Sequence, residues 1–297
     1  MPDIVDFEHD KINLELASGD KLGAAGVSLR YLDDGRVDVV LNEEIGRNAD
    51  IRRRDASGRL LESIQITTGN TRSGFTGSAY NRDGHGRPIE REEIKTSQVG
   101  GKSISDTTVK EPNGRLIQTV HVETSSAGNG RTVSDSVVKN EFGRTESSTR
   151  LVMTEANNRI VANVVSKDQN GNPFQLKDLT IVQTQNDTSG DYQIKNGQGI
   201  VMQQLHFKTS QLPNDRYITN AQLKDRLGTL LKTIQIDSVA NGPGKRSTNV
   251  VIKDRIGNVM ENIVIQSSSA QANNSVDIVR KNNLGMPREQ LQMRITK

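Results

Sequence analysis

The chain of 297 residues contains no cysteine and no tryptophan, and its nine aromatic residues are five Phe and four Tyr. Without cysteine, disulfide bonds, thiol catalysis and cysteine-ligated zinc are excluded. No apolar run reaches the roughly 18 residues of a transmembrane helix, and the N-terminus has acids where a secretory signal needs a basic start. We therefore expect no Sec signal, no membrane insertion and synthesis in the cytoplasm. The final location stays open between an assembled particle and the cell surface reached by another route.

The chain has few hydrophobic residues, and its charge is distributed unevenly along the sequence. Hydrophobic residues make up 32% of the chain, which is little for one thick core and favours an extended fold. Residues 1–50 hold twelve acids and five bases, whereas residues 51–297 hold 24 acids and 34 bases. We therefore divide the chain into an acidic N-terminal capping or docking segment, residues 1–50, and a second part, residues 51–297.

The second part is a tandem repeat of 28 or 29 residues. Its most regular column is glycine: Gly58, Gly86, Gly114, Gly143, Gly171, Gly199, Gly228, Gly257 and Gly285. Three residues before each glycine stands Asp, Asn or Glu, and directly before that a basic residue: Arg54, Arg82, Lys110, Lys139, Lys167, Lys195, Lys224, Lys253 and Lys281. A degenerate copy lies upstream at Asp33–Arg36.

Each repeat has the chemistry of a β-hairpin tip. Asp or Asn at the first position of a type I turn accepts backbone N–H groups, and glycine three residues later adopts the positive φ of a bulge. Apolar residues then alternate six and eight residues past most of the glycines, as in Ile64 and Ile66, which is the period of a strand. The sequence predicts an all-β fold, an extended antiparallel meander or ribbon of about 18–20 strands.

A β-solenoid and a large closed barrel are the alternatives to this ribbon. We favour the ribbon over the solenoid because the D-x-x-G tip reverses the chain. Seven prolines and few aromatics argue against a membrane barrel. The segments Asp55–Leu60 and Glu111–Leu116 also resemble the tyrosine-aspartate repeats of RHS-type shell proteins, although Lys or Arg replaces the aromatic before the acid. That resemblance implies a hairpin ribbon.

The sequence offers no arrangement typical of an enzyme. Its four histidines, His9, His85, His121 and His206, lie in separate repeats without a metal-binding or catalytic spacing. Gly-x-Gly occurs at Gly84 and Gly197, but no helix follows to cradle a phosphate. We predict a protein that is not an enzyme, with no catalytic residue, no cofactor and no metal site.

The repeated basic column is a candidate binding row. If the tips share one margin of a sheet, neighbouring hairpins lie about 9.6 Å apart, so that the bases from Arg54 to Lys281 form a row that could hold a polyanion or polysaccharide. Alternatively, each base pairs with a nearby acid and keeps the margin soluble.

The function that we expect from these features is structural. Free strand edges at both ends of a ribbon, together with an acidic N-terminus and a basic C-terminal hairpin, predict head-to-tail self-assembly into a fibre, sheath, shell or virion-type appendage. A polyanion- or polysaccharide-binding adhesin is the alternative. The candidate assembly contacts are Asp3, Ile4, Val5, Asp6, Phe7 and Glu8 at one end and Arg280, Lys281, Arg288 and Arg294 at the other. An N-terminus that folds back to cap its own sheet is equally compatible.

Overall fold

The computed structural model describes residues 4–8, 11–15, 27–31, 37–41, 48–71, 74–269 and 273–296; side chains are described from residue 48 onward, except at 70, 273 and 296. Four short strands come first: β1 (Ile4–Glu8), β2 (Lys11–Glu15), β3 (Val27–Tyr31) and β4 (Val37–Leu41). The strands of the first four hairpins are β5 (Asn48–Asp55), β6 (Leu60–Thr71), β7 (Gly74–Asp83), β8 (Pro88–Val99), β9 (Lys102–Lys110), β10 (Leu116–Ser126), β11 (Arg131–Asn140) and β12 (Thr145–Ala156). The strands of the last five are β13 (Arg159–Asp168), β14 (Pro173–Gln183), β15 (Asp187–Asn196), β16 (Val201–Leu212), β17 (Arg216–Asp225), β18 (Leu230–Ala240), β19 (Lys245–Asp254), β20 (Val259–Ser269), β21 (Asn273–Asn282) and β22 (Pro287–Thr296).

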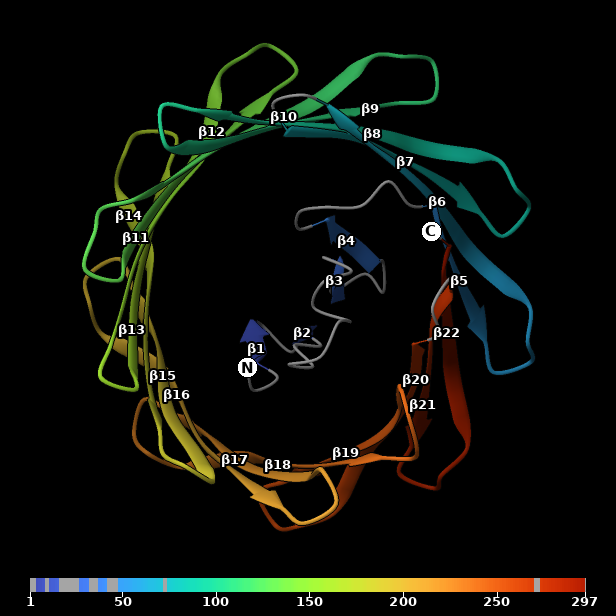
Figure 1. Ribbon diagram of the computed structural model, residues 1–297, viewed down its shortest axis with the longest axis vertical. Helices are drawn as coiled ribbons and strands as arrows, with labels where there is room; N and C mark the ends of the chain where they lie inside the picture. Colours follow the sequence, from blue (N-terminus) through green and yellow to red (C-terminus); the bar gives the residue numbers. More distant parts are fainter. Residues whose placement is uncertain are drawn as a thin grey trace.

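Strands β5 to β22 form one closed barrel of eighteen antiparallel strands (Figure 1). Each strand pairs with its neighbours in sequence, and β22 closes the ring on β5 with Met293 opposite Ile51 and Ile295 opposite Ala49. The all-β meander is confirmed, but the open ribbon and the solenoid are wrong, and the alternative of a large closed barrel is right. Closure is favoured because it removes the two long unpaired edges that a ribbon would expose.

The D-x-x-G segments form the nine tight turns at one rim of the barrel, which we call the tight rim. In each turn the glycine has a φ between +74° and +94°, and its N–H donates to the carbonyl of the Asp, Asn or Glu three residues earlier. The Asp168 carboxylate, for example, accepts the N–H groups of Asn170 and Asn172, both at 2.9 Å. A register shift follows each of the nine turns, which is the bulge that accommodates the positive φ.

The opposite rim, which we call the far rim, holds the turns between hairpins. Strand β5 starts there and β22 ends there, because an even number of strands returns the chain to the rim where it began. The four strands β1–β4 form a separate antiparallel sheet, which Figure 1 draws inside the ring.

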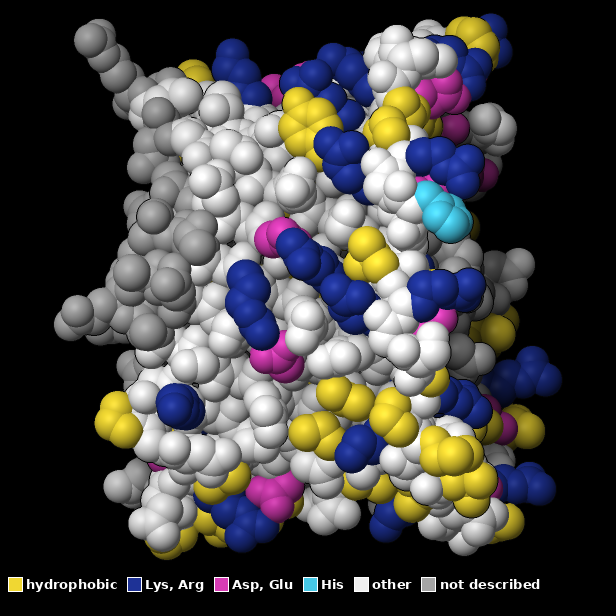
Figure 2. Space-filling view, turned by 90° about the vertical axis from the view of Figure 1, so that its right-hand side faces the viewer, with side chains coloured by type: hydrophobic (Ala, Val, Ile, Leu, Met, Phe, Trp, Pro, Cys, Tyr) yellow, Lys and Arg dark blue, Asp and Glu magenta, His cyan; other side chains and the backbone are white. Residues whose placement is uncertain are grey.

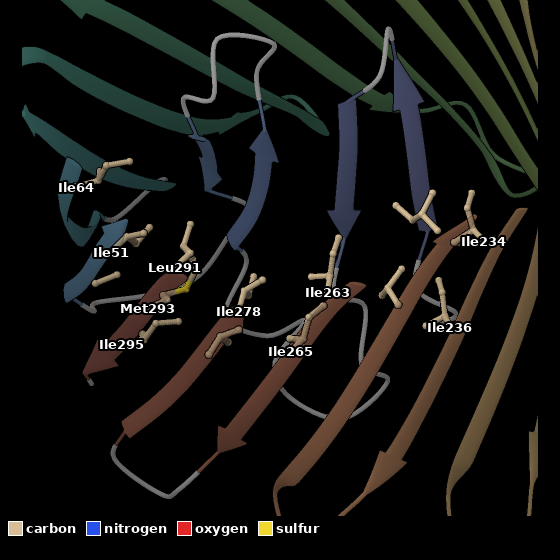
Figure 3. Packing of buried hydrophobic residues seen from close by; sticks show 14 of the residues in the cluster. Ile51, Ile64, Ile234, Ile236, Ile263, Ile265, Ile278, Leu291, Met293 and Ile295 are labelled. Atoms are coloured by element: carbon tan, nitrogen blue, oxygen red, sulfur yellow. The ribbon is translucent and has the colours of Figure 1, made fainter. Parts of the chain in front are cut away.

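Alternation along the barrel strands separates an inner from an outer face. Figure 3 shows Ile51 and Ile64 pointing from the wall into the ring, as do the labelled residues of β18, β20, β21 and β22. Residues opposite one another across antiparallel strands share a face, so the registers assign every barrel residue between the turns to one face. The inner face is therefore the apolar one over much of the ring, and the lumen that it lines is the candidate functional site.

Candidate functional site: the lumen of the barrel

One part of the inner face is a continuous apolar surface, which we call the isoleucine wall. It extends from β16 through β22 to β5 and β6 and consists of buried residues, each at most 8% exposed: Ala49, Ile51, Ile64, Ile66, Leu205, Ala221, Leu223, Ile234, Ile236, Val250, Ile252, Ile263, Ile265, Val276, Ile278, Leu291, Met293 and Ile295. Branched side chains on adjacent strands pack across the concave face, as Ile236 does opposite Val250 and Ile265 opposite Ile278.

The wall on β9 to β13, which we call the mixed wall, differs in chemistry and exposure. Its inward positions include the hydroxyl residues Ser103, Ser105, Thr107, Thr124, Ser134, Ser136, Thr149 and Ser166. Hydroxyls pair across strands, with 2.9 Å between Thr124 and Ser134 and 3.1 Å between Thr149 and Ser166. Apolar residues are also present, but Leu151 is half-buried where Ile236 is buried. This wall presents hydrogen-bonding groups that a water-filled lumen can solvate.

A charged ladder crosses the inner face between the isoleucine wall and the tight rim. Arg53 on β5 bridges Glu62 on β6 at 3.1 Å and Glu289 on β22 at 3.2 Å. Arg280 on β21 in turn bridges Glu289 at 3.1 Å and Glu261 on β20 at 2.6 Å. The side chains of Glu62 and Glu289 are 4% and 13% exposed, so these carboxylates depend on their partners for solvation.

The ladder ends at Asn81 on β7. Its Nδ2 donates to Glu62 at 2.7 Å, while its Oδ1 is buried without a hydrogen-bond partner. The sequence analysis missed the ladder. The sequence did contain an indication of it. The residue four positions after each repeat glycine lies on the same face of the strand as the apolar residues six and eight positions after it, yet it is polar in all nine copies. These residues are Glu62, Glu90, Gln118, Ser147, Gln175, Gln203, Lys232, Glu261 and Glu289.

The outer face carries polar and charged side chains between the rims. Cross-strand ion pairs include His121 with Asp106, Arg150 with Asp135, His206 with Asp191, Arg216 with Asp237, and Arg294 with Asp277. Figure 2, which shows the side with β5 to β7, has Lys, Arg and acids spread over the surface and hydrophobic side chains in separate patches. This polarity is the reverse of a lipid-facing barrel, where an apolar band lies outside and the lumen is polar.

Backbone hydrogen bonds at the tight rim favour the ionised form of Asp83 and Asp168. Hydrogen bonds from the backbone N–H groups of Arg87 and then His85 lower the pKa of Asp83, and those of Asn172 and Asn170 lower the pKa of Asp168. In three other turns Asn140, Asn196 and Asn282 accept the same bonds without a charge. The turn carboxylates therefore have a structural role, because an Asn side chain accepts the same hydrogen bonds in the equivalent turns.

The predicted basic row lies on the outer side of the tight rim, where every tight turn begins. Two of its members bond within their own hairpin: Arg54 donates to the carbonyl of Gly58 at 2.9 Å and Arg82 to that of Gly86 at 3.3 Å. Lys110 bridges Glu93 at 2.8 Å, and Lys195 bridges Asp178. Half-buried Lys224, Lys253 and Lys281 occupy the equivalent positions beside the isoleucine wall.

The candidate assembly contacts are not brought together as one surface. Arg280 lies in the inner ladder, whereas Arg294 lies on the outer face and bonds Asp277, and Lys281 and Arg288 lie at the tight rim. Of the N-terminal candidates, Ile4, Val5, Asp6, Phe7 and Glu8 fall in β1, whose side chains are not described, and Asp3 lies outside the described residues.

The histidines of the described residues are scattered: His121 and His206 lie on the outer face and His85 in a turn, while His9 lies outside the described part of the chain. Within the described residues, no cluster of three or more His, Asp or Glu side chains could hold a metal ion. No helix among the described residues is long and apolar enough to span a membrane.

Comparison with known proteins identifies the fold. No family model matches the chain, and no curated protein matches it. Among solved structures, the chain is similar to mutants of the porin of Rhodopseudomonas blastica. One aligns with a TM-score of 0.54 at 8% identity, over 84% of this chain and 97% of that chain. A structure titled as asymmetric conductivity of engineered proteins aligns with a TM-score of 0.53 at 10% identity, over 85% of this chain and 99% of that chain. The chain thus has a porin-like barrel fold.

This finding overturns several expectations. The fibre, sheath or shell function and the head-to-tail homo-oligomer are wrong, because the strand edges that assembly required are paired to each other in β5 and β22. The adhesin alternative, with its polyanion or polysaccharide partner, gains no support from a porin-like barrel. The reasoning behind the expectations of no membrane insertion and of a location reached without a membrane segment is also overturned. It rested on apolar runs and aromatic girdles, and neither criterion tests a porin-like barrel, because membrane barrels of this fold span with alternating strands.

Proposed function

We propose that this protein is a non-enzymatic barrel that acts through its lumen, as a passage for small polar solutes. The observation that carries the proposal is the closed ring of eighteen strands. Barrels of about 16–18 strands are wide enough to leave an aqueous channel, whereas those of about 8 strands are filled by side chains. The hydroxyl groups of the mixed wall supply a surface along which water and polar solutes can move.

The polar outer face favours a second candidate, a barrel surrounded by water that holds an apolar guest. An Arg or Lys facing lipid at the bilayer midplane costs about 2–4 kcal/mol. Pairs such as Arg216 with Asp237 reduce that cost by partial neutralisation, but the wall also carries the amides Asn220, Gln235 and Asn249. In this candidate the isoleucine wall is the binding surface.

We further propose that the sheet of β1–β4, in the N-terminal segment, lies against the isoleucine wall and narrows the passage. The registers of β1–β4 give their sheet one face with only apolar and aromatic positions: Val5, Phe7, Ile12, Leu14, Val27, Leu29, Tyr31, Val37, Val39 and Leu41. The opposite face has mainly charged and polar positions. An amphipathic sheet needs an apolar partner, and the inward side chains of the isoleucine wall are buried although they line a lumen.

Reconstitution of the full chain into vesicles tests the passage. The measurement is release of an entrapped monosaccharide compared with an entrapped dextran. We expect release of the small solute alone. Ser134→Trp places a bulky ring on the mixed wall and is expected to slow release, whereas Val133→Trp, on the outer face of the same strand, serves as the matched control.

Absence of release from vesicles that contain folded barrel contradicts the passage and leaves the second candidate.

Alkylation of single cysteines tests the position of the N-terminal segment. The cysteine-free chain permits the variants Ile236→Cys and Leu151→Cys. We expect slow alkylation at position 236 and fast alkylation at 151. Cleavage at a protease site inserted after Gly46 should expose position 236. Equal alkylation rates at both positions in the uncleaved chain would contradict the proposal that the N-terminal sheet covers the isoleucine wall.

A further inference from the structure

Hydrophobic side chains stand exposed at the tips of three consecutive hairpins on the tight rim. Leu227, Ile256 and Leu284 directly precede the repeat glycines of the β17–β18, β19–β20 and β21–β22 hairpins and are 80%, 75% and 74% exposed. Adjacent tips are two strands apart, about 9.6 Å. Polar residues occupy the same position in most of the other hairpins, as Asn113 and Asn170 do. Phe142 is the exception, because it holds this position in the β11–β12 hairpin beside the mixed wall and is 75% exposed. The other three apolar tips adjoin one another and form an arc on the side of the isoleucine wall.

Other exposed apolar residues extend this arc around the rim. Met286 is 53% exposed, Met260 is 44% exposed, and on the neighbouring β15–β16 hairpin Ile200 is 52% exposed. None of these positions is required by the turn, whose geometry is set by the glycine and by the Asp or Asn side chain. Several exposed apolar residues gathered on one stretch of the rim, where the fold does not need them, indicate an interaction site.

The same arc is strongly basic. Its three turns, residues 224–230, 253–259 and 281–288, contain the six bases Lys224, Arg226, Lys253, Arg255, Lys281 and Arg288 and the two acids Asp225 and Asp254, a net charge of +4. Both acids accept backbone N–H groups of their own turns. Arg226, Arg255 and Arg288 are exposed and form no ion pair among the described residues.

Apolar tips flanked by exposed guanidinium groups and half-buried ammonium groups match the surface of an anionic bilayer. The apolar side chains enter the acyl boundary while the bases above them meet the phosphate and carboxylate headgroups. We propose that this arc, centred on Leu227, Ile256 and Leu284, docks the barrel by its tight rim on an anionic lipid surface. The contact is peripheral at the tips and does not depend on whether the wall crosses the bilayer.

A single tryptophan reports this contact directly, because the chain contains none. In the full-length protein, Leu227→Trp places the probe in the arc and Asn113→Trp places it at the equivalent turn position on the opposite side of the rim. With phosphatidylcholine vesicles containing phosphatidylserine, we expect a blue shift of the emission at position 227 and none at 113.

Vesicle sedimentation measures the affinity. The triple variant Leu227→Ser, Ile256→Ser, Leu284→Ser should lower vesicle partitioning by at least about tenfold. The matched variant Asn113→Ser, Asn170→Ser, Gln198→Ser should leave it unchanged. Replacing Arg226, Arg255 and Arg288 by Gln should lower partitioning about fivefold for each charge and abolish the preference for phosphatidylserine.

Three results would overturn the proposal, two of them from vesicle binding. One is a folded protein that fails to sediment with the anionic vesicles. The other is binding that the triple tip variant does not weaken. A tip variant that alters only the oligomeric state in solution would assign the arc to a protein contact and also overturn it. Sedimentation of protein added to sealed vesicles measures the docking arc alone, whereas solute release after reconstitution measures the passage, so the two proposals fail separately.

Discussion

The isoleucine wall and the mixed wall are built from the same repeat yet differ in chemistry and burial. Both have the same tight turns and bulges. They differ at inward positions on both strands of a hairpin: β20 has Ile263 and Ile265 where β12 has Thr149 and Leu151, and β19 has Val250 where β11 has Ser136. The turn residues therefore determine the backbone, and the inward strand residues determine what the lumen presents. One fold can thus carry two different inner surfaces.

The largest difference should appear when one charge of the inner ladder is removed. Arg53→Met leaves Glu62 and Glu289 buried without that partner, and we expect a loss of about 3–5 kcal/mol of unfolding free energy. Arg294→Met, which breaks the exposed pair with Asp277, should cost about 0–1 kcal/mol. Denaturant titration of both variants measures the contrast. Adding Glu62→Gln to Arg53→Met should restore part of the loss, and equal costs for the two arginines would contradict a buried ladder.

Truncating one apolar residue on each wall compares their packing. Ile278→Ala removes a side chain that is 2% exposed, and we expect a loss of about 2–5 kcal/mol. Leu151→Ala removes a half-buried side chain of the mixed wall and should cost about 1 kcal/mol, because less area returns to water. The readout is the denaturation midpoint at constant slope. A Leu151 variant as damaging as the Ile278 variant would mean that the mixed wall is equally covered.

A turn substitution should affect the two walls alike. Gly171→Val lies between β13 and β14, and Gly257→Val lies between β19 and β20. In each case the new Cβ meets no atom within 4 Å, so the cost comes only from the positive φ, about 1–2 kcal/mol. Thermal unfolding should show one transition with similar losses. A second transition in one variant would show that the walls unfold separately.

The smallest expected effect is on the stability of the fold at low pH. Because the turn bonds lower the pKa of Asp168, its ionised form stabilises the folded state above the unfolded pKa of about 3.9, and this contribution is lost as the pH falls through the folded value. Asp168→Asn keeps the acceptor oxygen, as Asn140 does in its turn. We expect a change of less than about 2 °C in melting temperature at neutral pH and a shallower fall on acidification. An unchanged acid slope would contradict a role for this carboxylate.

Local chemistry made the hairpins predictable, and a distant contact made the barrel unpredictable. The D-x-x-G spacing and the alternation after it predict every turn of the tight rim and most of the strand pairs, because those contacts join neighbours in sequence. Closure depends on β22 pairing with β5, as Leu291 does opposite Arg53, and no local pattern specifies which strands meet across 234 or more residues. The apolar face was evident from its period, but its inward direction follows only from closure.

The candidate site was predictable to a smaller degree. The basic row was found because it repeats, whereas the inner ladder depends on charges at inward positions of five neighbouring strands that meet only in the closed ring. Few aromatics and no long apolar run led us to reject membrane association. Both are criteria for particular lipid-facing surfaces and do not test whether a sheet closes.

Because one repeat supplies one complete hairpin, the girth of this ring can change only in whole repeats. Duplication or loss of a copy would widen or narrow the circumference by two strand spacings, about 9.6 Å, without altering any turn. The two closing strands would remain the same, since insertion between them leaves Ile51 and Met293 at the ends of the array. Unequal crossing-over within such a gene therefore offers a direct route to a graded series of bore sizes.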